Sequence, residues 1–97
     1  MRLVYHPHVQ RDVTDAMRYY DGAGGVELGD AFFAELCAHV ELARESPSRF
    51  HRVAGELRRV NLKRFPYHFL FRTVGDVVRV LVVRHDRRDP SFGLGRR

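Results

Sequence analysis

Two apolar runs separated by only two residues constrain this chain more than any other feature of its sequence. The runs Tyr67–Val74 and Val77–His85 are rich in aromatic and β-branched side chains, and Gly75 and Asp76 stand between them. Such side chains favour strands, and glycine at the first position of a two-residue loop permits the positive φ of a primed hairpin turn. The sequence therefore predicts an antiparallel β-hairpin over residues 67–85.

The expected turn also predicts which side chains of the hairpin share a face, because successive residues of a strand point to opposite sides. One face is almost wholly apolar, and we expect it to lie beneath helices. The other face is amphipathic, and we expect it to be partly open. The expected pairs are Val74 with Val77, Arg72 with Arg79, Phe71 with Val80 and Phe69 with Val82. The open face would carry His68, Leu70, Arg72, Val74, Val77, Arg79, Leu81, Val83 and His85.

Upstream of the hairpin, the spacing of apolar residues changes twice. Residues 2–6 form a short strand-like run, residues 8–20 and 28–45 have helical spacing, and residues 57–63 alternate. The glycine-rich residues 21–25 should join the two helices as an antiparallel helical hairpin, and residues 49–56 should be an irregular linker. The predicted fold is α+β in the order β-α-α-β-β-β. The helical hairpin would pack on one face of a small, mainly antiparallel, four-stranded sheet.

Size and composition place the chain among single-domain cytoplasmic proteins. Its 97 residues, 44% of them hydrophobic, suit one domain over residues 1–97. No apolar run is long enough for a membrane span, the first residues lack the apolar core of a secretory signal, and Cys37 has no partner for a disulfide. His6 and His8 lack further ligands for a metal, and we expect neither a metal nor a cofactor.

The net charge of +5 is unevenly distributed along the chain. Residues 1–57 hold six basic and nine acidic side chains, whereas residues 58–97 hold eleven basic and three acidic ones. Sixteen of the seventeen cations are arginines, which make bidentate contacts with phosphate and carboxylate. The basic half indicates a polyanionic partner, either nucleic acid or an acidic protein segment, or else a basic surface that is simply solvated.

The predicted open face collects the candidate functional residues. Arg72 and Arg79 would stand opposite each other, so an anion between them would relieve their repulsion. His68 and His85 would project from the same face, roughly 7–8 Å apart at Cβ, and two imidazoles near guanidinium groups can cleave a phosphodiester by acid–base chemistry. Two exposed histidines on an arginine-rich sheet explain the pattern equally well.

Further cations would extend this surface. On the preceding run, Arg59, Asn61 and Lys63 alternate on one side and would continue a basic strip across the sheet. The charged stretch after the last strand would contact phosphate or a protein target, or form local ion pairs in solvent. Gly93, Gly95 and the terminal arginines favour fraying of residues 86–97. The candidate residues for binding a target or an anion are Lys63, Arg72, Arg79, Arg84, Arg87 and Arg88.

The run NLKRFPYHFLFRTVGDVVRVLVVRHDRRDP, preceded by a strand and two amphipathic helices, resembles the ParE/RelE superfamily of bacterial toxins, often labelled plasmid stabilization proteins. The resemblance covers essentially the whole chain. It rests on FPY at the start of one strand, on the apolar last strand and on the ending HDRRDP. It implies a sheet with a helical hairpin on one face. It also implies an acidic antitoxin that wraps the toxin, in a complex that can be a homo- or hetero-oligomer.

The resemblance leaves the target open between two branches of the superfamily. RelE-like members cleave mRNA on the ribosome, and their basic residues correspond here to Arg59, Asn61, His68 and Arg88. Under that alternative Arg59, His68, His85 and Arg88 would be catalytic, but the tyrosine that follows the last strand is missing. ParE-like members poison DNA gyrase, and the ending HDRRDP is more like theirs. We therefore expect a ParE-like toxin, with a ribosome-dependent endonuclease and a degenerate toxin acting as a binding module as the alternatives.

Overall fold

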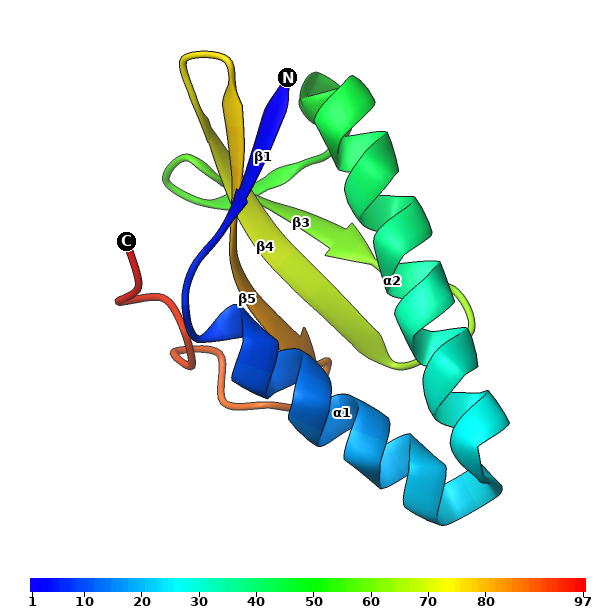
Figure 1. Cartoon of the computed structure of the whole chain (residues 1–97). Coiled ribbons are helices and arrows are strands. Elements are labelled where there is room, and N and C mark those ends of the chain that lie inside the picture. Colours follow the sequence, from blue (N-terminus) through cyan, green and yellow to red (C-terminus); the bar gives the residue numbers. More distant parts are fainter.

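The computed structural model describes residues 1–97 as an α+β fold, in the order that the sequence predicts except for one additional strand. Two helices lie against one face of a twisted sheet (Figure 1). Neither is long and apolar enough to cross a membrane. The elements are β1 (Arg2–Tyr5), α1 (Val9–Gly24), α2 (Val26–Glu45), the short 3₁₀ helix η1 (Pro47–Arg49), β2 (Arg52–Ala54), β3 (Leu57–Asn61), β4 (Tyr67–Val74) and β5 (Val77–His85).

The sheet has five strands in the order β1-β5-β4-β3-β2, so the prediction of four strands was wrong by one. The parallel pair is β1 with β5, and every other neighbouring pair is antiparallel. The additional strand, β2, lies in the segment predicted to be an irregular linker. Its three residues are all exposed, so they show none of the apolar alternation by which a strand is recognised in a sequence.

The two helices are joined by Gly25 alone, rather than by the five turn residues that the sequence predicts. Gly25 has a φ of 84°, a conformation that glycine adopts without steric cost. The helices touch closely near this joint, because a Cβ on Gly29 would lie 1.9 Å from the Asp21 carboxylate. They then diverge as a V instead of running antiparallel (Figure 1).

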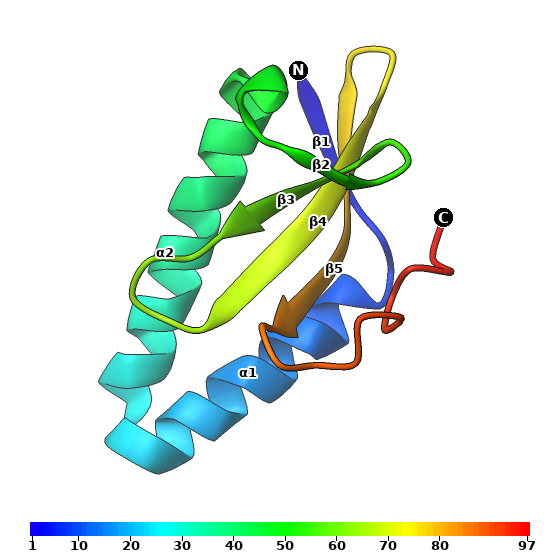
Figure 2. The ribbon, with the colours of Figure 1, turned by 180° about the vertical axis from the view of Figure 1, so that it is seen from behind.

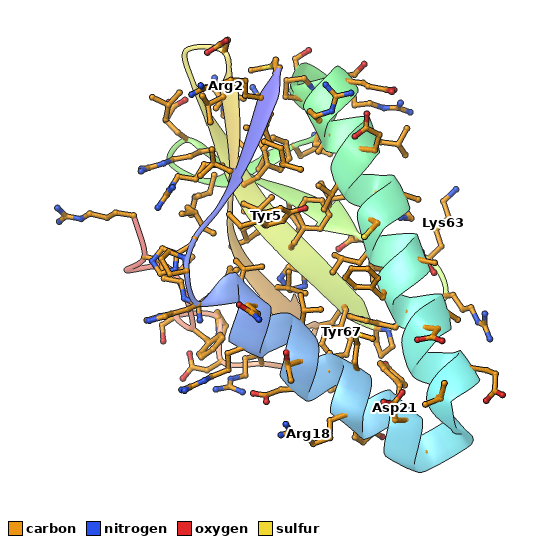
Figure 3. All side chains as sticks on the ribbon, in the orientation of Figure 1. Arg2, Tyr5, Arg18, Asp21, Lys63 and Tyr67 are labelled. Atoms are coloured by element: carbon orange, nitrogen blue, oxygen red, sulfur yellow. The ribbon has the colours of Figure 1, made fainter.

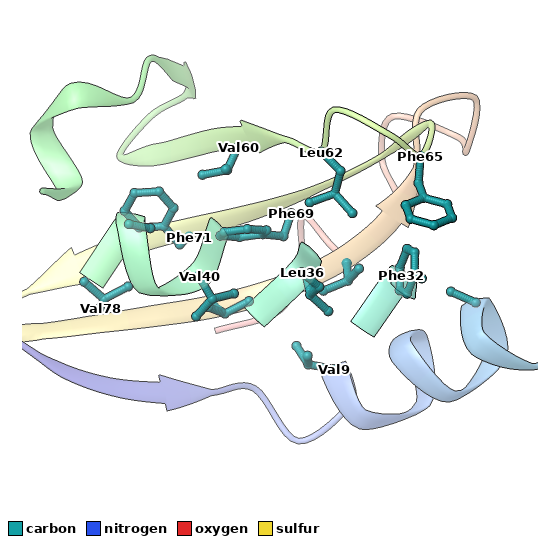
Figure 4. Close-up of a cluster of buried hydrophobic side chains, with 14 of the residues drawn as sticks. Val9, Phe32, Leu36, Val40, Val60, Leu62, Phe65, Phe69, Phe71 and Val78 are labelled. Atoms are coloured by element: carbon teal, nitrogen blue, oxygen red, sulfur yellow. The ribbon is translucent and has the colours of Figure 1, made fainter. Parts of the chain in front are cut away.

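The helix-facing side of the sheet, here called the inner face, forms the main core. Phe69 and Phe71 point inward and are fully buried, as the hairpin pattern predicts. They pack with Phe32, Leu36 and Val40 of α2 (Figure 4). The cluster also takes in residues of α1, the end of α2, β3, the β3–β4 connection and β5, which are Val9, Ala16, Tyr20, Ala43, Val60, Leu62, Phe65, Val78, Val80 and Val83.

A shift in register within the β4–β5 hairpin reverses the predicted faces of β5 beyond Leu81, whereas β4 keeps the faces that were predicted. The pairs of Val74 with Val77, Arg72 with Arg79 and Phe71 with Val80 are confirmed, but Phe69 pairs with Val83 rather than Val82. Leu81 is the additional residue at this bulge, between Leu70 and Phe71 on the partner strand. From Val82 onward β5 is therefore offset by one residue, which moves Val82 to the outer face and Val83 and His85 to the inner face.

The opposite side of the sheet, here called the outer face, was predicted to be partly open; Val74 near the turn is exposed, but the middle of this face is buried. Leu70, Leu81 and Val82 are at most 2% exposed although they are not part of the helix-side cluster. Residues 86–97, here called the tail, lie beside β5 (Figure 2). The backbone of the tail touches the sheet directly, because a Cβ on Gly93 would lie 2.6 Å from a Val82 methyl carbon. The tail is packed rather than frayed.

Candidate functional site

His68 lies on the outer face, where it is buried rather than exposed as predicted. It is 2% exposed and pairs across the strands with Arg84. Its Nδ1 is 2.8 Å from Oδ1 of Asp86, and Nε of Arg84 donates to its Nε2 at 2.9 Å. A guanidinium group can only donate, so Nε2 must accept and the proton must reside on Nδ1. His68 is therefore a neutral imidazole that donates to Asp86.

Arg84 and Asp86, the two partners of His68, make further contacts that hold the tail in place. Arg84 Nη1 donates to the carbonyl oxygens of Pro90 and Phe92, each at 2.8 Å. Nη2 of Arg59 lies 3.5 Å from the Asp86 carboxylate. Burial lowers the pKa of His68, and the nearby Arg59 and Arg84 lower it further, although the hydrogen bond to Asp86 raises it. The neutral form of His68 thus suits a site that holds two guanidinium groups.

His85 lies on the inner face, so the expected His68–His85 pair does not form. Its ring packs against Tyr67 at a centroid distance of 5.2 Å, and these two residues are opposite each other in the sheet. The Arg87 backbone N–H donates to Nδ1 of His85 at 3.0 Å, which leaves Nε2 as the nitrogen with a proton to donate. The one-residue offset at the bulge separates the two histidines.

A groove of about 940 Å³, here called the basic groove, lies between α1, the end of β5 and the tail. Sixteen residues line it, of which only four are hydrophobic. Two aspartates, Asp12 and Asp15, face five arginines. Those arginines are Arg11, Arg18, Arg84, Arg88 and Arg96.

A buried ion pair builds one wall of the basic groove. Arg96 of the tail binds both carboxylate oxygens of Asp12 on α1, at 2.7 and 3.1 Å. The same carboxylate accepts the Val83 backbone N–H at 3.0 Å, and Arg96 also donates to the Leu81 carbonyl at 3.0 Å. These bonds join α1, β5 and the tail. The Arg96 guanidinium compensates the charge of Asp12.

Arg88 is held at another wall of the groove by an aromatic ring. Its guanidinium carbon lies 3.9 Å from the centroid of the Phe92 ring, and that of Arg96 lies 5.1 Å from the same centroid. Such cation–π contacts fix the orientation of a long side chain. On α1, Nη1 of Arg18 lies 3.8 Å from Oδ1 of Asp15. Both side chains are largely exposed, so this ion pair is weak.

The remaining predicted residues lie elsewhere. Arg72 and Arg79 are opposite each other on the outer face, as predicted; Arg79 donates to the Arg97 carbonyl at 2.6 Å, and the buried Nε of Arg72 has no partner. Lys63 lies in the β3–β4 connection beside α2, away from Arg18 below α1 (Figure 3). The backbone N–H of Lys63 donates to Glu35 of α2. Arg87 is exposed just after β5.

The structure thus distributes the predicted site over three places. Arg84, His85 and Arg88 line the basic groove, and the outer face carries His68 and the other strand residues. Arg84 belongs to both places, because it also donates to His68. Lys63 is separate from both. Sequence reasoning missed the contributions of α1 and the end of the tail to the groove. Arg11 and Arg18 are seven residues apart on one helix face, a usable signal, whereas Asp12 and Arg96 are 84 residues apart and have none.

The side chains form no group of three or more His, Cys, Asp or Glu that could hold a metal ion. His6 and His8 instead contact each other edge to face, with ring centroids 4.9 Å apart. The His8 backbone N–H donates to Nδ1 of His6 at 3.0 Å.

Comparisons with known proteins agree with this architecture. Residues 3–90 match the family described as the ParE toxin of the type II toxin-antitoxin system, parDE. Toxin ParE2 from Mycobacterium tuberculosis, in strains CDC 1551 and H37Rv, is 26% identical over 90 residues, which cover 93% of this chain and 86% of the relative. A solved structure titled the chromosomal ParDE TA system from P. aeruginosa has the same fold. It superposes with a TM-score of 0.79 at 17% identity, covering 88% of this chain and 95% of that one. The chain belongs to the ParE toxin family of type II toxin-antitoxin systems.

Proposed function

We propose that this ParE-type toxin inhibits growth by acting on DNA gyrase and that a cognate antitoxin neutralises it. The observation that carries the choice of gyrase over mRNA cleavage is the state of His68. Both of its ring nitrogens are already engaged, one with Asp86 and one with Arg84. A general base needs a nitrogen free to accept a proton from the reacting group. In this arrangement His68 stabilises the fold and has no free nitrogen with which to accept a proton.

The other residues of the nuclease alternative also do not converge. Arg59 lies on the outer face beside Asp86, whereas Arg88 lines the basic groove with His85. Acid–base cleavage of a phosphodiester needs an acid, a base and a charge-stabilising cation around one phosphate. This separation favours action through binding of a target.

The distribution of charge supports an acidic antitoxin segment as the partner. Residues 58–97 hold eleven basic and three acidic side chains, so a negatively charged segment would be attracted to this half of the chain. On α2, Phe33 and Leu42 are 47% and 39% exposed and offer apolar anchors for such a segment. The neighbour from P. aeruginosa is itself titled a ParDE system.

Two assays on the purified full chain test the target. With gyrase and supercoiled DNA, we expect toxin-dependent accumulation of cleaved DNA complexes. With translating ribosomes, we expect intact mRNA. Cuts in mRNA that disappear in His68→Ala would instead establish the endonuclease alternative.

Induction in cells tests whether the toxin is active and how it is neutralised. We expect growth to stop when the toxin is expressed alone. We also expect a short acidic reading frame to lie beside its gene and growth to resume when that frame is co-expressed. Unimpaired growth in both cases would contradict a toxic function and favour a degenerate binding module.

A further inference from the structure

The basic groove contains guanidinium groups that no carboxylate neutralises. Arg96 compensates Asp12, and Arg18 partly compensates Asp15 at 3.8 Å. Arg11 and Arg88 line the same groove, and neither forms an ion pair with any carboxylate of the chain. The groove therefore has a surplus of positive charge that faces solvent.

Arg88 is already held in position for a ligand. Its guanidinium lies 3.9 Å from the Phe92 ring centroid, and its backbone N–H donates to the His85 carbonyl at 2.9 Å. A long side chain loses much rotamer freedom when it binds, and prior ordering reduces this cost. Phe92 is itself held through its carbonyl, which accepts a hydrogen bond from Arg84 at 2.8 Å.

Two further donors belong to the same groove. His85 accepts at Nδ1 from the Arg87 backbone, so its remaining ring nitrogen carries a proton. The N-terminal residues of α1 also line the groove, and the His8 side chain does not cap the helix. The partial positive charge of a helix N-terminus adds to that of the arginines.

The lining indicates which kind of polyanion fits. An amphipathic acidic peptide would need an apolar surface for its hydrophobic residues, whereas only four of the sixteen lining residues are hydrophobic. A nucleic-acid backbone needs only charged and N–H donors directed at its phosphates. We propose that the basic groove binds phosphate groups of a nucleic-acid backbone, with Arg11 and Arg88 as the principal contacts. The interaction does not require gyrase.

Direct binding tests this proposal. The full-length toxin is titrated against a fluorescent duplex DNA and a single-stranded RNA of equal length, at several salt concentrations. In the double variant Arg11→Gln/Arg88→Gln, we expect affinity at low salt to fall about tenfold or more. The slope of log K against log salt should fall by about 2, because each lost phosphate contact on duplex DNA removes about 0.9. The preferred probe identifies the source of the phosphates.

The matched control is Arg49→Gln/Arg64→Gln, which removes the same charge outside the groove. These arginines also lie over phenylalanine rings, Phe50 at 5.7 Å and Phe65 at 5.4 Å. In this control variant, we expect affinity for the nucleic-acid probes at low salt to fall by less than about threefold. Equal losses in both double variants would show diffuse attraction rather than a site and would overturn the proposal.

Two other results would also contradict it. One is the absence of binding to either probe. The other is displacement of the bound probe by polyglutamate of equal total charge, with the same dependence on Arg11 and Arg88, because the groove would then be a carboxylate site. The nucleic-acid titration does not depend on gyrase being the target, since gyrase poisoning by the wild type is measured in a separate assay. A toxin that traps gyrase but does not bind nucleic acid would refute only the groove proposal.

Discussion

Both faces of the sheet contain buried side chains, but different forces bury them. On the inner face, Phe69, Phe71 and their neighbours pack against two helices in one apolar cluster of fifteen residues. On the outer face, three aliphatic side chains lie beneath a tail anchored by His68, Arg84 and the Asp12–Arg96 pair. Apolar packing is non-directional and distributed over many contacts, whereas the tail depends on a few directional bonds. The outer face should therefore be more sensitive to single polar substitutions and to pH.

The largest effect is expected on the inner face. Phe71→Ala should lower the free energy of unfolding by about 3–5 kcal/mol, because it removes a fully buried ring and leaves a cavity. Urea unfolding followed by circular dichroism measures the change. Phe33→Ala is the control, since Phe33 is exposed, and should cost less than about 1 kcal/mol. Similar losses in the two variants would refute this description of the core.

The buried ion pair should come next. Asp12→Ala leaves Arg96 without its partner and Val83 without an acceptor, so we expect a loss of roughly 3 kcal/mol. In a double-mutant cycle, Asp12→Ala/Arg96→Ala should cost clearly less than the sum of the single variants. Additive losses would mean that the pair does not fasten the tail to α1.

His68 should make the stability of the outer face depend on pH. Burial lowers its pKa in the folded state, so the stabilisation it provides is fully present above the unfolded pKa of about 6.5. That stabilisation is lost as pH falls through the folded pKa, because the unfolded chain binds the proton more readily. At neutral pH, His68→Gln should cost about 1–3 kcal/mol, since Gln cannot satisfy both Asp86 and Arg84.

Chemical denaturation across the acidic range checks this linkage. The free energy of unfolding should decline less steeply towards low pH in His68→Gln than in the wild type. His51→Gln is the control, because His51 is exposed and its side chain is not part of a hydrogen-bond network. An unchanged pH profile in His68→Gln would disprove the role assigned to the network.

The smallest effect is expected from the exposed pair on α1. Asp15→Asn should change the free energy of unfolding by less than about 0.5 kcal/mol, because Asp15 and Arg18 are both largely exposed. It should also strengthen binding of a polyanion in the basic groove slightly, since it removes one of the two carboxylates there. Thermal melting and the nucleic-acid titration measure the two effects.

Much of the fold could be predicted from local sequence patterns, and most of the candidate site could not. Arg72 opposite Arg79 followed from the turn, because both lie between the turn and the bulge. His85 lies beyond the bulge, so its face was predicted incorrectly. The additional residue at this bulge is Leu81 rather than a glycine, so no residue type marks the bulge in the sequence.

Hydrophobic periodicity alone determined the helical pair, the C-terminal hairpin and the inward orientation of Phe69 and Phe71, because each depends on residues close together in the chain. The tertiary structure decided that His68 is buried, that His85 lies on the opposite face and that Arg96 reaches Asp12. Those outcomes depend on contacts between residues 16 to 84 positions apart, whose formation depends on how the whole chain packs. The uneven charge was visible in the sequence, but only the fold gathers five arginines around one groove.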